Sequence, residues 1–196
     1  MNDTFLAALD TETQQDAEAE LLACCASERW AAEVAARRPY HDLATLRGVS
    51  GAALDALDWP DVLQALAGHP RIGEPATGEG GAGSRAVSGE RGEGDQPATG
   101  GGSHGRAAEW SRAEQATVSN AATTDERTAA ELAAGNAEYE RRFGHVFLIC
   151  ASGRTAAQVL AALRERLAND EDTERRLVRA ELRKIVDLRL ARLVGE

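Results

Sequence analysis

Apolar residues recur at helical spacing along most of this chain, and this periodicity restricts the fold more than any other feature of the sequence. The pattern predicts two or three helices over residues 5–36 and further helices over 43–57, 58–68, 110–121, 124–143, 155–167 and 172–194. Aromatic residues make up only 4% of the chain, whereas Ala, Leu, Glu and Arg are frequent. The sequence therefore predicts an all-α fold, with one domain over residues 1–196 and about eight helices.

Several segment boundaries carry specific signals. Ser27, Thr124 and Thr155 stand where a side-chain oxygen can cap the first turn of a helix, and Gly144 stands where a helix should end. The apolar run 146–150 is too short for a helix of its own, so we expect a buried extended connector there.

A glycine-rich segment interrupts the helical pattern. Of the 19 glycines, 12 fall within residues 73–105, so the segment lacks the apolar surface needed to offset the entropy of ordering it. We expect a flexible or disordered insertion over 74–105. Residues 78–83 match G-x-G-x-x-G, but no strand precedes them and no amphipathic helix follows, which argues against a dinucleotide site. His104 lies in the same segment and is given no chemical role.

Charge and hydropathy exclude several classes of partner. The formal net charge of -10, from 22 basic and 32 acidic residues, argues against nucleic acid and anionic membrane surfaces, although one Arg could still bind a small anion. No apolar run reaches transmembrane length, and the N-terminus lacks a basic segment followed by an apolar one. We expect a soluble cytoplasmic protein.

The cysteines predict neither a disulfide framework nor a metal site. Cys24, Cys25 and Cys150 are odd in number and have no paired spacing, so reduced thiols are expected. The chain also carries no motif for a metal or another cofactor.

His69 follows a short helix with clear boundaries. Asp58 and Pro60 suit its start and Gly68 its end. Because Pro70 comes next, His69 is expected in an extended conformation at the negative end of the helix, where an imidazolium would be favoured. The alternative is an ordinary loop histidine.

Glu114 has two interpretations. Residues 111–114 (SRAE) have the spacing of a capping box, which would make Ser111 and Glu114 purely structural. Glu114 also falls on the apolar stripe of Trp110, Ala113 and Val118, where a carboxylate needs a partner or a ligand.

Arg189 interrupts the apolar stripe of the last helix, which contains Leu182, Ile185, Val186 and Leu193. A core-facing guanidinium either pairs with an internal carboxylate or binds an anionic ligand. The alternative is an Arg whose stem is buried and whose charged end reaches solvent.

These residues lie within blocks that resemble the signature segments of 2-oxo-4-hydroxy-4-carboxy-5-ureidoimidazoline (OHCU) decarboxylases. The blocks are residues 25–30 (CASERW), 38–40 (RPY), 68–73 (GHPRIG), 111–116 (SRAEQA), 139–150 (YERRFGHVFLIC) and 181–190 (ELRKIVDLRL). The resemblance covers nearly the whole chain outside the glycine-rich segment. It implies an all-helical homodimer that decarboxylates OHCU to (S)-allantoin without a cofactor, the last step of urate degradation.

The resemblance also implies roles for individual residues. His69 would be the catalytic acid and base, acting with Glu114 and Arg189, of which Arg189 would bind an anion. The remaining substrate-binding positions would be Pro70, Ser111, Gln115, Phe147, Leu148 and Ile149, the last three through their backbone.

Two departures from the family pattern matter. Residues 144–147 are Gly-His-Val-Phe where an aromatic residue and a proline are usual, and the glycine-rich segment is longer than expected. The residues alone leave open a related helical lyase or hydrolase acting on another ureido or hydroxy acid, and a helical binding module without catalysis.

Overall fold

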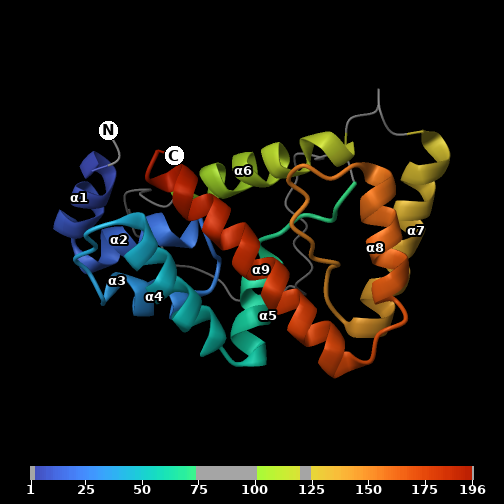
Figure 1. Ribbon diagram of the computed structural model, residues 1–196, viewed down its shortest axis with the longest axis horizontal. Coiled ribbons are helices and arrows are strands. Elements are labelled where there is room, and N and C mark those ends of the chain that lie inside the picture. Colours follow the sequence, from blue (N-terminus) through green and yellow to red (C-terminus); the bar gives the residue numbers. More distant parts are fainter. Residues whose placement is uncertain (1–2, 74–100, 120–124, 196) are drawn as a thin grey trace, which may run out of the picture.

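The structure is a computed structural model that describes residues 3–73, 101–119 and 125–195 (Figure 1). All regular secondary structure within these ranges is helical, as predicted. The helices are α1 (Asp3–Thr11), α2 (Gln14–Leu22), α3 (Glu28–Ala35), α4 (Leu43–Asp55), α5 (Trp59–Ala67), α6 (Gly101–Ser119), α7 (Glu126–Phe143), α8 (Ala156–Arg166) and α9 (Glu171–Leu193).

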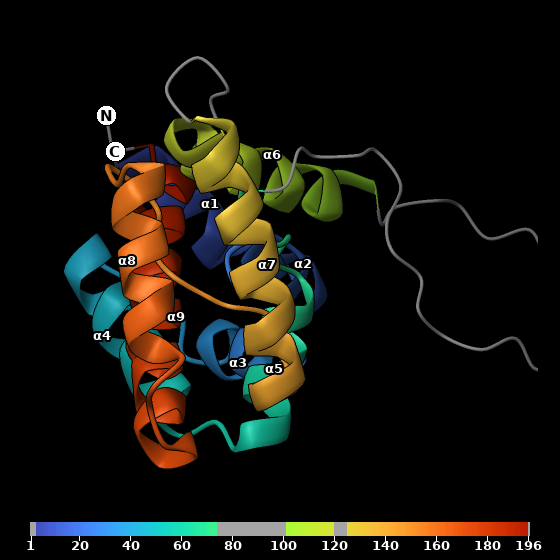
Figure 2. The ribbon, with the colours of Figure 1, turned by 90° about the vertical axis from the view of Figure 1, so that its right-hand side faces the viewer.

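Helix α9 runs through the middle of the molecule, with α1–α5 on one side of it and the α7–α8 pair on the other (Figure 1). Figure 2 shows α7 and α8 packed side by side. Apolar side chains of α1–α5 and α9 form one core, and those of α7 and α8 form a second. Helix α6 contacts both α2 and α8 and so connects the two groups of helices.

The predicted helix boundaries before His69 are confirmed. The Asp58 carboxylate accepts a hydrogen bond from the backbone N–H of Asp61, Pro60 lies in the first turn of α5, and Gly68 is the C-cap. Ser27 caps α3 in the same way. His69 therefore begins the connection that follows a short, well-capped helix.

The boundaries after residue 120 follow the same chemistry. Thr155 and Gln158 form the expected capping box of α8. Helix α7 is capped by Asp125, whose carboxylate accepts from the backbone N–H of Thr128. Thr124, the expected cap, lies outside the described residues.

Helix α6 begins earlier than predicted, at Gly101 rather than near Trp110. The prediction of a flexible or disordered insertion is therefore wrong for residues 101–105, which are helical. The rest of that segment, residues 74–100 with the 78–83 motif, lies outside the described ranges. Arg106 forms an ion pair with Glu20 of α2, so tertiary contacts stabilise the helix despite the low helical propensity of its glycines. Because Ser111 lies inside the helix, the capping-box interpretation of Ser111 and Glu114 is also wrong.

Gly144 ends α7 with a left-handed backbone, at φ 75°. We expect Gly144→Ala to lower the free energy of unfolding by about 1 kcal/mol, because an L-residue is strained there. Gly48, in α4, is a matched control. An added Cβ at either glycine meets no atom within 4 Å, so Gly48→Ala should raise stability by about 0.5–1 kcal/mol. Urea denaturation measures the change in unfolding free energy for each variant. Equal changes at the two positions would contradict a left-handed backbone at Gly144.

Cys24, Cys25 and Cys150 are free thiols, as predicted. Among the helices of the described ranges, none combines the length and the apolar character required to cross a bilayer.

Candidate active site

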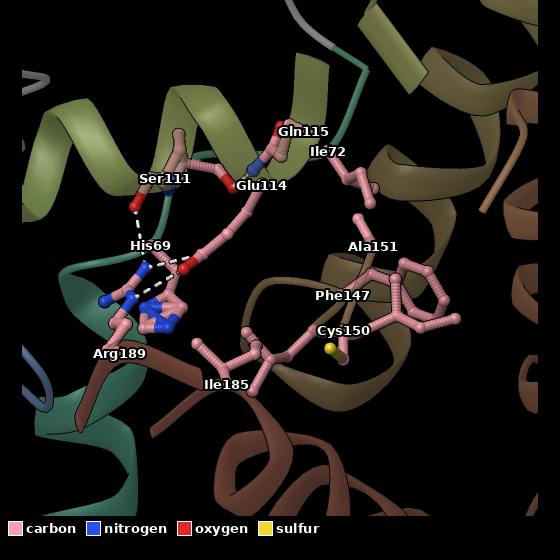
Figure 3. A pocket seen from close by; sticks show the side chains of 13 residues that line it. His69, Ile72, Ser111, Glu114, Gln115, Phe147, Cys150, Ala151, Ile185 and Arg189 are labelled. Carbon is pink, nitrogen blue, oxygen red and sulfur yellow. Dashed lines mark hydrogen bonds and ion pairs between the residues drawn. The ribbon is translucent and has the colours of Figure 1, made fainter. Parts of the chain in front are cut away.

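One pocket lies where the two groups of helices meet (Figure 3). Its walls come from the segment after α5, from the middle of α6, from the extended segment between α7 and α8, and from α9. The lining residues are His69, Pro70, Ile72, Ser111, Glu114, Gln115, Phe147, Leu148, Ile149, Cys150, Ala151, Ile185 and Arg189.

All nine candidate residues named from the sequence line this pocket, although they are spread from position 69 to position 189. Sequence reasoning missed four further lining residues, namely Ile72, Cys150, Ala151 and Ile185. The sequence carries a signal for each of them. Ile185 lies one turn before Arg189, and the other three lie in or beside the blocks that resemble the family. The functional roles of the nine residues remain predictions.

Arg189 and Glu114 form a buried ion pair in the pocket wall. The Arg189 Nε donates to Glu114 Oε1 at 3.1 Å, and Nη2 donates to Oε2 at 2.9 Å. The same Nη2 donates to the Ser111 hydroxyl at 2.9 Å, as the dashed lines in Figure 3 show. Only 2% of Arg189 and 8% of Glu114 is exposed, so neither charge is solvated by bulk water. Arg189 therefore does not extend its charged end to solvent, which was the alternative to a core-facing role.

A second guanidinium also contacts Glu114. Arg192 lies one turn after Arg189 on α9, and its Nη1 donates to Glu114 Oε1 at 3.1 Å. The sequence does not single out Arg192, because a residue near the end of a helix gives no sign of its partner 78 positions away. Glu114 is thus shared by two cations.

The imidazole of His69 is buried in the wall of this pocket. Both ring nitrogens are buried, and neither has a hydrogen-bond partner among the described residues. Figure 3 shows the ring beside the Arg189 guanidinium. Burial, together with the positive charge of Arg189, lowers the pKa of His69 to about 3. The expectation of a favoured imidazolium is therefore wrong, because desolvation outweighs the effect of the helix end. At neutral pH His69 is a proton acceptor.

This low pKa predicts a pH-dependent stability. The unfolded chain protonates His69 near its ordinary pKa of 6.5 and the folded protein only near 3. The contribution of neutral His69 is therefore complete above pH 6.5 and is lost as the pH falls toward 3. From about pH 7.5 to about pH 5, the wild type should lose about 1–2 kcal/mol more unfolding free energy than His69→Ala. Urea titrations at the two pH values measure this difference, and equal losses would show that His69 titrates normally.

Neighbouring helices fix the segment that carries His69. Gln115 of α6 donates to the backbone oxygen of Pro70 at 3.3 Å, and Asn136 of α7 donates to that of Ile72 at 2.9 Å. Arg71 forms a two-pronged ion pair with Glu140 of α7. The segment is therefore held against α6 and α7 by side chains from both.

The opposite wall is the predicted extended connector, and charged side chains fix its backbone. Arg166 of α8 donates to the Leu148 oxygen at 2.6 Å, and the Glu181 carboxylate of α9 accepts from the Cys150 N–H at 2.8 Å. Successive side chains of this segment point to opposite sides. Leu148 accordingly packs in the first core, whereas Phe147 and Ile149 pack in the second.

His145 lies within the block 139–150, at a position where the resemblance to OHCU decarboxylases implies an aromatic residue. Its ring packs edge-on against Trp59 and Tyr139, with centroid separations of 5.4 Å to each. Burial lowers the pKa of His145 and so favours the neutral ring. The substitution therefore preserves an aromatic cluster beneath the wall, and His145 does not line the pocket.

A buried polar network supports the same wall. The carboxylate of Glu174 is fully buried and accepts from Arg166, from the Tyr139 hydroxyl and, at 2.8 Å, from Asn169. Hydrogen bonds from these three donors hold the pKa of Glu174 below its ordinary value despite its burial. Since Arg166 also contacts the Leu148 backbone, the network links α7, α8 and α9 to the pocket.

This arrangement defines a class of all-helical proteins in which a largely apolar pocket holds a neutral imidazole together with a buried guanidinium and carboxylate. A family model for OHCU decarboxylases matches residues 10–101 and 94–191. The chain belongs to the OHCU decarboxylase family.

Two relatives show the extent of the sequence similarity. The uric acid degradation bifunctional protein TTL of Arabidopsis thaliana is 31% identical over 182 residues, covering 91% of this chain and 48% of the relative. The 2-oxo-4-hydroxy-4-carboxy-5-ureidoimidazoline decarboxylase of Amia calva is 38% identical over 84 residues, covering 43% of this chain and 47% of the relative. The chain's matches thus span about half the length of each relative.

Solved structures share the fold. A crystal structure of OHCU decarboxylase in the presence of (S)-allantoin aligns with a TM-score of 0.67 and 27% identity, over 91% of this chain and 99% of the other. A structure of (S)-allantoin synthase aligns with a TM-score of 0.61 and 15% identity, over 96% of this chain and 53% of the other, and this likeness concerns the fold alone.

Proposed function

We propose that this protein decarboxylates OHCU to (S)-allantoin. The observation that carries the proposal is the buried imidazole of His69, which has no hydrogen-bond partner among the described residues and lies beside Arg189 and Glu114 in one pocket of a chain that belongs to this family. The related crystal structure obtained with (S)-allantoin supports the same product.

The substrate can supply its own electron sink. In OHCU the carbon that carries the hydroxyl and the carboxylate adjoins a ring C=N bond. When the carbon–carboxylate bond breaks, carbon dioxide leaves and the electron pair forms a new C=C bond. The C=N electrons move to nitrogen, which takes a proton from solvent. The hydroxyl must then lose its proton while the neighbouring ureido-bearing carbon gains one.

His69 suits these last two transfers. As a neutral imidazole it accepts the hydroxyl proton, and the imidazolium that results returns a proton to the ureido-bearing carbon. Because this ring lies on one wall of the pocket, protonation occurs on one face and gives a single enantiomer. The neutral state set by burial is the state that the first transfer requires.

The other residues orient the substrate. In this proposal Arg189 holds the departing carboxylate through a charge-assisted contact. Glu114 and Ser111 accept or share hydrogen bonds with ureido and ring N–H groups. The walls around the substrate ring are completed by Pro70, Gln115 and the backbone of residues 147–149. Holding the reacting atoms in this way reduces the entropic part of the barrier.

The test is an assay with freshly generated substrate. OHCU is produced from urate with urate oxidase and hydroxyisourate hydrolase, and circular dichroism follows the product. Rapid appearance of optically active (S)-allantoin is expected. Racemic allantoin formed no faster than without protein would refute the proposal, and a panel of other ureido and hydroxy acids would then identify a related substrate.

We also propose that the protein is cytoplasmic and forms a homodimer, the homodimer being what the resemblance to the family implies. Light scattering after size exclusion distinguishes the 20.8 kDa monomer from a particle of twice that mass.

A further inference from the structure

We propose that Arg192 is a positioning residue that frees the charge of Arg189 for the carboxylate of the substrate. The inference rests on the proposed function, since it concerns how the same pocket binds an anion.

The carboxylate of Glu114 has two cationic partners. Its Oε1 accepts from Arg189 Nε and from Arg192 Nη1, both at 3.1 Å, and its Oε2 accepts from Arg189 Nη2 at 2.9 Å. Two guanidinium groups and one carboxylate leave one positive charge without an anionic partner in this cluster. Arg189, the cation that lines the pocket, is therefore able to attract a second anion.

Without Arg192 the charges would balance. The Arg189–Glu114 pair would then be neutral, and a carboxylate entering the pocket would have to compete with Glu114 for the guanidinium. With Arg192 present, Glu114 keeps a cationic partner when Arg189 turns toward the ligand. A buried carboxylate that lost its partner would otherwise oppose this exchange.

The two arginines differ in exposure in the way that this division of roles requires. Only 3% of the Arg189 side chain is exposed, and it faces the pocket, whereas 32% of the Arg192 side chain is exposed. Arg192 does not line the pocket, so it acts through Glu114 and not by touching the substrate.

The test compares Arg192→Gln with Arg192→Lys, which keeps the charge. Arg192→Gln should raise the KM for OHCU by about tenfold and leave kcat within about twofold, and Arg192→Lys should restore most of the KM. Inhibition by neutral (S)-allantoin should not change in either variant. Arg183→Gln is the control. It removes a positive charge from the same helix, but Arg183 pairs with Asp55 and not with Glu114.

A merely structural role would weaken allantoin and OHCU binding together, and this outcome would overturn the inference. A lysine variant that behaves like the glutamine variant would overturn it as well, because the charge would then not be what matters.

Equilibrium binding separates this inference from the proposed function. The probes are N-carbamoylglycine, an anionic ureido acid, and hydantoin, its neutral cyclic counterpart, titrated by calorimetry. The wild type should prefer the anion, and Arg192→Gln should lose that preference. If the wild type shows this preference but does not convert OHCU, only the proposed function fails. If the wild type shows no preference for the anion, or Arg192→Gln keeps it, the inference fails.

Discussion

Replacing His69 by alanine is expected to lower kcat for OHCU by about 10²–10⁴-fold, the usual contribution of a positioned acid and base. The fold should be retained, since neither ring nitrogen has a hydrogen-bond partner among the described residues. Circular dichroism of the product gives the rate, and far-UV dichroism with thermal unfolding checks the fold.

His41→Ala is the matched control for this experiment. His41 is an exposed histidine outside the pocket, so its removal should leave kcat unchanged. Near-normal turnover by a folded His69→Ala variant would remove His69 from the mechanism. An unfolded variant would instead direct the test to His69→Asn, which retains a polar side chain of similar reach.

The second large effect is expected on stability, at Glu174. Glu174→Gln leaves the buried Arg166 without its anionic partner, so the free energy of unfolding should fall by about 3–5 kcal/mol. The side chains of Arg166 and Glu174 are 8% and 1% exposed, and water cannot compensate for the lost charge. Urea denaturation measures the change.

Glu171→Gln provides the comparison within the same helix. Glu171 lies in the first turn of α9 and pairs with Arg175, but its side chain is 68% exposed. An exposed pair of this kind contributes little, so the change should stay within about 0.5 kcal/mol. Similar small losses in both variants would mean that the Arg166–Glu174 network does not support the wall.

The helices and the pocket could be predicted because their signals are local. Apolar spacing and capping residues located α5, α8 and α9, and a charged residue on an apolar stripe singled out Arg189. The structure then shows why such a charge is tolerated in the core, since Arg189 pairs with Glu114, which the sequence had marked as a second anomaly. Two anomalies of opposite charge thus explain each other.

The errors of the sequence analysis arise from contacts between distant segments. The start of α6 depends on packing against α2, which no local glycine count reveals. The protonation state of His69 depends on burial and on a guanidinium 120 positions later, so the helix end alone gave the wrong sign. Arg192 and Glu174 were missed because a charged residue on a helix usually faces water, and only the fold shows its partner.

The extended wall of the pocket belongs to both cores at once. Leu148 is packed among the side chains of one group of helices, and Phe147 and Ile149 among those of the other. A shift of one group of helices relative to the other would therefore also displace the backbone of residues 147–149. The position of this pocket wall therefore depends on how the two groups of helices pack against each other. Substitutions far from the pocket that change this packing can alter turnover while each core remains well folded.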